Sequence, residues 1–133
     1  MPSSSEPGPK RSPVTDEEHA AEDERIAWRL ADLAEFGHDA AYTVAQGLDA
    51  YLDEGPAGRV LRNNGRQILI QTATVVEKLP EDFKRAHPDV EWVRIARMHN
   101  LIAHHYDRVN DRLVFTALAQ RVPQMLQALG IVA

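Results

Sequence analysis

Apolar residues recur at intervals of three and four positions in four long segments of the chain. This spacing is typical of amphipathic helices that bury one face. The segments cover residues 26–48, 56–78, 92–106 and 110–130. Shorter helical turns are expected at residues 48–54 and 81–86. Because neither a hairpin signal nor an internal repeat occurs, the sequence predicts an all-α fold, an antiparallel helical bundle of four to five helices.

Local signals refine the helix boundaries. Residues 15–18, Thr-Asp-Glu-Glu, fit a capping box, so the first helix can begin as early as Asp16, although its apolar stripe is convincing only from Ile26. Residues 68–76 are rich in β-branched side chains and could form a strand. Their position inside a longer segment of helical period favours a helix. Pro123 has no N–H to donate and is predicted to kink the last helix.

The chain divides into a tail and one domain. Residues 1–14 are rich in Pro, Ser and Gly and are predicted to be a disordered tail, so residues 15–133 form the helical domain. The sequence has no cysteine, which excludes disulfides and thiolate metal sites. It also lacks an apolar run of about 18 residues and the apolar middle of a signal peptide. We therefore expect a soluble, cytoplasmic protein without a membrane partner.

The net charge of −5 is unevenly distributed. Residues 1–24 hold seven of the 20 acidic residues but only two of the 15 basic ones, so the rest of the chain is neutral. That neutral part contains two groups of arginines: Arg59, Arg62 and Arg66, which share a helix face, and Arg94, Arg97, Arg108 and Arg112, which flank the histidine-rich segment of residues 92–106. These guanidinium groups could bind phosphates, or they could equally be solvated and paired with nearby acids.

Candidate chemistry is concentrated in residues 92–106, which contain three of the six histidines, two arginines and a tyrosine. At about 100° per residue, one arc of this helix is apolar. It contains Trp92, Ile95, Ala96, Met98, Ile102, Ala103 and Tyr106. Arg97, Asn100 and His104 fall together on the opposite side. On composition alone such a stripe is usually the solvated face of a bundle helix.

The pattern Met98-x-Asn100-x-x-Ala-His104-x-Tyr106, preceded by Trp92-x-x-Ile-Ala, resembles the signature helix of HEPN-domain proteins, specifically the HepT-type toxins. The likeness extends over roughly residues 23–130. It implies a HEPN-like bundle that acts as a homodimeric, metal-independent ribonuclease, the toxin of a type VII toxin–antitoxin pair. It also implies an MntA-like nucleotidyltransferase antitoxin that neutralises the toxin by AMP transfer to Tyr106. From its position alone, Tyr106 could equally be a core residue.

The resemblance suggests roles for individual residues. His104 has a pKa near neutrality and suits proton transfer, while Arg97 suits stabilisation of a charged phosphorane. Asn100, one turn before His104, could orient the imidazole or the phosphate. In the family a homodimer brings two such helices together, so a composite cleft is expected. The predicted RNA contacts are Arg62, Arg66, Arg94 and Arg108, and we expect no cofactor.

One position departs from the family pattern. His99 occupies the slot in which the family usually has an arginine, and we keep it among the candidate catalytic residues. On the helical wheel His99 falls within the apolar arc and could simply pack there. The alternative hypothesis is therefore a catalytically inactive HEPN bundle that serves as a binding module for the nucleotidyltransferase.

A metal site is the rival interpretation of the histidines. Metal ligands on one helix are usually three or four residues apart, whereas His99 and His104 are five apart and His105 is adjacent to His104. Because no carboxylate completes a ligand set within a turn, we predict no metal site. His19, His38 and His87 are isolated in the sequence and are expected at the surface.

Overall fold

Long helices account for most of the chain that the computed structural model describes, residues 15–105 and 108–131. They are α1 (Asp16–Ala45), α2 (Leu48–Tyr51), α3 (Pro56–Glu77), α4 (Glu81–Arg85), α5 (Trp92–His104), α6 (Asp111–Thr116) and α7 (Val122–Ala128), with a π-helical turn at Ala117–Arg121 between α6 and α7. This part of the chain contains no strand, which confirms the predicted all-α bundle. Residues 1–14, predicted to be a disordered tail, lie outside the described residues.

The predicted capping box starts α1. The Thr15 hydroxyl accepts from the Glu18 amide at 3.1 Å, and the Thr15 amide donates to the Glu18 carboxylate at 3.0 Å. This backbone hydrogen bond, and then the one from the Thr15 hydroxyl, lower the pKa of Glu18. The charged form is thus favoured in the folded helix, so the cap persists at neutral pH and weakens as the pH falls through that lowered pKa.

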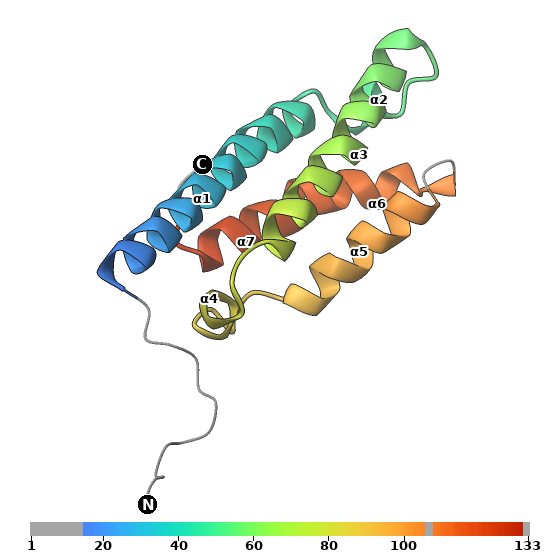
Figure 1. The fold of residues 1–133 in the computed structure, drawn as a ribbon. Coiled ribbons are helices and arrows are strands. Elements are labelled where there is room, and N and C mark those ends of the chain that lie inside the picture. The colour runs from blue at the N-terminus through green and yellow to red at the C-terminus, as the bar shows by residue number, and fades with distance from the viewer. Residues whose placement is uncertain (1–14, 106–107, 132–133) are drawn as a thin grey trace, which may run out of the picture.

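The helices pack around a single apolar core. α1 packs on α3 and on the C-terminal helical segment, whereas α5 packs mainly on α3. Figure 1 shows α1 and α5 on opposite sides of the bundle, with α3 and the C-terminal segment between them. The most deeply buried large side chains are Leu33, Tyr51, Ile102 and Leu118. Each contributes about 1.5–3 kcal/mol through burial. None of the described helices is long and apolar enough to cross a membrane.

A glycine allows α2 and α3 to approach each other closely. Tyr51 of α2 is completely buried and its ring lies 5.2 Å from that of Phe115. A Cβ atom at Gly65 would collide with the Tyr51 hydroxyl and come within 3.0 Å of Leu118. The absence of a side chain at Gly65 therefore makes room for the tyrosine.

The last helix accommodates its internal proline by widening. The Val122 amide donates to the carbonyl of Ala117, five residues earlier, which is the π pattern. Directly after this turn comes Pro123, which cannot donate and whose ring would crowd the carbonyl four residues before it in an α-helix. The predicted disturbance at Pro123 is therefore realised as a π turn. Gly130, with φ of 75°, follows the C-terminal end of α7.

Candidate active site

The first residue of α5, Trp92, fixes the direction in which this helix leaves the preceding loop. Its indole N–H lies 3.1 Å from two carbonyl oxygens, those of Lys84 and His87. The His87 ring stacks on Phe83 with centroids 4.3 Å apart. These contacts tie α5 to the short helix α4. Trp92, which begins the family-like motif, therefore also holds α5 in place.

The predicted polar stripe lies on the exposed face of α5. Arg97, Asn100 and His104 are all exposed, whereas Ile102 on the opposite side is only 2% exposed. The three polar side chains make no hydrogen bond or ion pair with the described part of the chain. They are therefore available to a ligand or a partner. Ala103, assigned to the apolar arc, is exposed instead.

Two large apolar residues accompany this stripe. Val93 is 66% exposed and Leu101 is 55% exposed, and at about 100° per residue both fall on the outward side of α5 with Arg97. An exposed apolar side chain alone needs no explanation. Here two of them flank three unpartnered polar side chains on one helix, which makes the face of α5 (Val93, Arg97, Asn100, Leu101 and His104) a mixed surface suited to contact with a macromolecule.

His99 lies on a different side of α5. Its side chain is 20% exposed, and its Nδ1 atom is inaccessible to solvent and lies 3.3 Å from the Glu77 carboxylate of α3. These two atoms are within ion-pair distance but do not form a hydrogen bond. The structure thus brings Arg97, Asn100 and His104 together on one face and leaves His99 packed toward α3.

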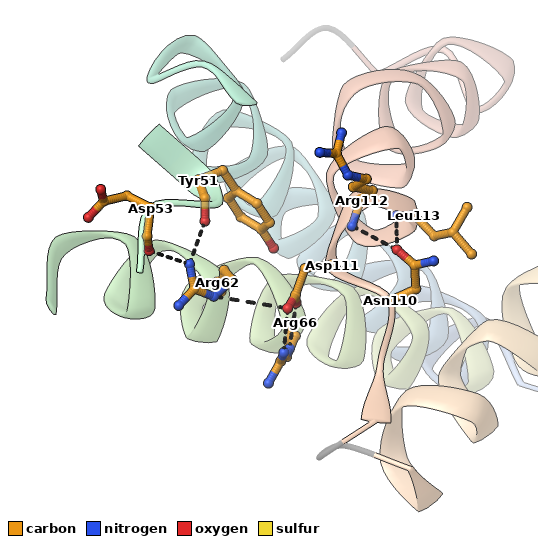
Figure 2. A network of polar contacts seen from close by, with 8 residues as sticks. All are labelled: Tyr51, Asp53, Arg62, Arg66, Asn110, Asp111, Arg112 and Leu113. Atoms are coloured by element: carbon orange, nitrogen blue, oxygen red, sulfur yellow. Dashed lines mark hydrogen bonds and ion pairs between the residues drawn. The ribbon is translucent and has the colours of Figure 1, made fainter. Parts of the chain in front are cut away.

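Arg62 and Arg66 form an internal network (Figure 2). The Arg66 guanidinium binds both carboxylate oxygens of Asp111, at 2.9 and 2.8 Å, and Arg62 donates to the carbonyls of Tyr51 and Asp53 at 3.0 and 2.6 Å. The two arginine side chains are 18% and 15% exposed. RNA binding by this pair stays a prediction, and the geometry gives both residues a structural role.

The other two predicted RNA contacts are at the surface. Arg94 is exposed and pairs with Glu91 at 3.1 Å. Arg108 is exposed and makes no side-chain ion pair with the described residues. Arg94 belongs to α5 and Arg108 follows its last residue by four positions, so these two, rather than the α3 pair, are positioned to extend a surface that begins at Arg97.

The connection between α5 and α6 is fixed at its C-terminal end. The Asn110 side chain caps α6 by accepting from the amides of Arg112 and Leu113 at 3.0 and 3.3 Å. Asp111, the next residue, is the partner of Arg66 (Figure 2). Tyr106, the predicted modification site, belongs to this connection and lies outside the described residues.

The histidines do not gather. In residues 15–105 and 108–131, no three His, Asp or Glu side chains are close enough to share a metal ion. His19 and His38 are exposed, as expected. His87 is not: it is partly buried, with Nδ1 2.9 Å from the Phe83 carbonyl. His87 is less exposed than predicted because its ring stacks on Phe83 of α4.

Comparison with known proteins agrees with this helical order. A family model described as "Ribonuclease HepT-like" matches residues 61–131. A "Putative RNase" of Methanocaldococcus jannaschii is 32% identical over 99 residues, 74% of this chain and 73% of that protein. The chain belongs to the HepT-like family, so the predicted HEPN-like bundle is correct.

Other relatives match a shorter stretch. The "Probable ribonuclease HepT" of Thermococcus cleftensis is 33% identical over 49 residues, 37% of this chain and 44% of that protein. A "Putative RNase" of Caldanaerobacter subterraneus is 32% identical over 50 residues, 38% of this chain and 45% of that protein. The match therefore spans less than half the length of these two relatives. No solved structure matches the chain.

Asp111 is the residue near the site that sequence reasoning missed as a partner. The pairing could not be found from local spacing, because 45 residues separate Asp111 from Arg66. The only available signal was the i, i+4 spacing of Arg62 and Arg66, which places two guanidinium groups on one face and therefore calls for an anion between them.

Replacing Asp111 by Asn should destabilise the protein by about 1–3 kcal/mol, because the carboxylate charge is lost and an NH2 donor replaces one of the two oxygens that accept from Arg66 in a partly buried position. Urea denaturation measures the change. Asp82→Asn is the matched control, because Asp82 pairs with Arg85 on the open surface, and it should cost less than about 1 kcal/mol. Equal losses for both variants would show that the Arg66–Asp111 pair has no special structural role.

Proposed function

We propose that this protein is a metal-independent ribonuclease, the toxin of a type VII toxin–antitoxin pair. The observation that carries the proposal is the exposed set of Arg97, Asn100 and His104, which have no partner among the described residues and lie on one face of α5. Membership of a family described as ribonucleases supports the reaction type. The sequence relatives named as ribonucleases support it too.

The chemistry requires little beyond these side chains. The ribose 2′-oxygen attacks the adjacent phosphorus while the bond from phosphorus to the 5′-oxygen breaks. One group accepts the proton of the 2′-hydroxyl and another donates a proton to the leaving 5′-oxygen, which gives a 2′,3′-cyclic phosphate and a 5′-hydroxyl. An imidazole such as His104 serves either role near neutral pH. The Arg97 guanidinium stabilises the charge on the phosphorane oxygens.

The proposal includes a homodimer, because one helix face is too flat to enclose a phosphodiester. Two copies of α5 related by a twofold axis would place two Arg97–His104 sets around one cleft. One imidazole would then act as the base and the other as the acid. The exposed Val93 and Leu101 beside the set supply apolar surface that such an interface could bury.

Regulation by the nucleotidyltransferase partner rests on the His104-x-Tyr106 motif. The Tyr106 oxygen would attack the α-phosphorus of ATP and lose its proton while pyrophosphate leaves, and the attached AMP would place a bulky anion two residues from His104. Repulsion of the RNA backbone and occupation of the cleft would then block cleavage. The surrounding surface carries Arg108, which could pair with the added phosphate.

His104→Ala should reduce the cleavage rate of RNA by at least about 100-fold, because proton transfer typically contributes that much to the rate. Cleavage of a fluorescent RNA by the purified protein in excess EDTA measures the effect. His38→Ala, which removes an exposed histidine on α1, is the control and should leave the rate unchanged. Undiminished cleavage by His104→Ala would remove this residue from the mechanism.

Val93→Glu should convert the dimer to a monomer, because it places a charge on each protomer at the proposed twofold interface. Light scattering coupled to size-exclusion chromatography measures the mass, and cleavage should be lost together with the dimer. Val60→Glu is the matched control, because Val60 is similarly exposed at 58% but belongs to α3 and not to the face of α5. If both variants remain dimeric and active, the interface does not include this face of α5.

His99 gives the alternative function its support. This residue occupies the slot of the family's arginine and is packed toward Glu77, away from the face of Arg97 and His104. A protein without that arginine could bind the nucleotidyltransferase without cleaving RNA.

His99→Arg distinguishes the two functions. If the chain is an inactive binding module, arginine at position 99 should create cleavage and growth arrest in an otherwise harmless protein. If the chain is an active ribonuclease, cleavage is present before the change, and the variant alters its rate only modestly. Growth after induction, together with the rate of RNA cleavage by the purified proteins, decides between these outcomes.

A further inference from the structure

A groove separates α5 from the C-terminal helical segment. It consists of two cavities of about 360 and 420 Å³ that are adjacent, because Leu69, Arg94, Met98 and Arg121 line both. Leu69 of α3 lies at the base of both. The groove exists because α5 packs mainly on α3 and leaves its other flank open. Its size is that of a site for a small organic ligand.

The half next to α6, which we call the Arg97 half, is cationic. It is lined by Arg94, Arg97, Arg108 and Arg121, and no carboxylate is among its lining residues. Arg94 and Arg121 have a partner in Glu91, at 3.1 and 3.9 Å. Arg97 and Arg108 have no ion-pair partner in the described chain. The two guanidinium groups without an ion-pair partner among the described residues, those of Arg97 and Arg108, therefore lie in the Arg97 half, where they can bind a phosphate.

The other half, which we call the Thr72 half, has more apolar than polar surface, and its polar lining residues are Thr72, Asp89, Glu91, Arg94, His99, Arg121 and Gln124. Three threonines inside helices, Thr43, Thr74 and Thr116, donate to the carbonyl four residues earlier at 2.8–3.0 Å. Thr72 does not: its hydroxyl is buried without a hydrogen-bond partner, and the residue is 5% exposed. Thr72 lines the cavity together with Ala73, Ile95 and Met98.

A buried polar group without a partner costs free energy, so an unused hydroxyl beside a cavity points to a ligand that completes the hydrogen bond. The ligand must combine an anion for the Arg97 half with a body that offers apolar surface to the Thr72 half, and it must carry a polar edge. A nucleotide unit of RNA meets all three requirements. RNA is recognised in sequence-specific fashion mostly through bases that leave the stack.

We infer that this groove binds one unstacked base of the RNA substrate and that Thr72 reads the edge of that base. The inference rests on the proposed function for the identity of the substrate. Arg97 belongs both to the face of α5 and to the groove, so the base is that of a nucleotide adjacent to the cleaved bond. The groove makes the protein a ribonuclease with a base preference.

Binding can be measured without cleavage. Methyl NMR spectra of the full chain are recorded during titration with each of the four nucleoside 5′-monophosphates and with inorganic phosphate. The methyl groups of Thr72, Leu69 and Met98 should shift in a saturable manner with one or two nucleotides, and much less with phosphate. Equal shifts with phosphate, or no shifts, overturn the inference. Shifts that follow protein concentration only would mean that a second copy fills the groove, and they also overturn it.

Thr72→Val tests whether the Thr72 hydroxyl recognises the base. It removes the hydroxyl and keeps the shape, so the melting temperature should not fall. Cleavage is measured on four RNA oligonucleotides that differ only in the base beside the cleaved bond. The ratio of the fastest to the slowest cleavage rate should fall by about fivefold to tenfold. Thr74→Val is the matched control on the same helix, and it should leave the preference unchanged because Thr74 is not among the residues that line the groove.

Failure of the inference and failure of the proposed function give different results. Cleavage of all four oligonucleotides at equal rates, or a preference that Thr72→Val leaves intact, overturns the base site while the ribonuclease remains. Selective binding of a nucleotide without cleavage of any RNA overturns the ribonuclease while the site remains. His104→Ala separates the two in one protein, because it should abolish cleavage and retain nucleotide binding.

Discussion

The bidentate pairing of Arg66 with Asp111 determines where the C-terminal helical segment begins relative to α3. Asp111 is the first residue of α6, and Asn110 immediately before it caps that helix. The pair therefore fixes the position of a helix start and not only that of a side chain. Arg62 adds a connection from α3 to the carbonyls of Tyr51 and Asp53, so one small polar network joins α2, α3 and α6 (Figure 2). Charge-assisted bonds in a partly buried position can hold such a geometry where exposed ion pairs cannot.

This constraint shapes the site because α5 has few neighbours. Trp92 ties its first turn to α4, and the Arg66–Asp111 pair ties down the far end of the connection that follows it. Between these two anchors α5 rests mainly on α3. One flank of α5 therefore faces solvent with Arg97, Asn100 and His104, and another borders the groove. The proposed cleavage face and the proposed base site are consequences of a helix that is held at both ends and packed on one side.

Much of this arrangement could be predicted from local sequence. The capping box at Thr15, the proline at the start of α3 and the glycine after α7 each act within one turn, so their effects follow from the residues themselves. The opposition of Ile102 to Arg97 and His104 follows from the helical period alone. The run of β-branched residues in α3 became helical because its surroundings have a helical period and because Ile68, Leu69, Thr72 and Val76 are buried against neighbouring helices.

The sequence by itself determined the helices, the polar stripe of α5 and the family to which these patterns belong, because amphipathic period and caps depend on residues a few positions apart. Only the tertiary structure decided which arginines remain free. Arg62 and Arg66 looked the same as Arg97 and Arg108 until Asp111, 45 residues from Arg66, was brought beside the first two. It also decided that His99 packs toward Glu77 and that the Thr72 hydroxyl is left without a partner. Such outcomes depend on contacts between distant segments, which local spacing does not encode.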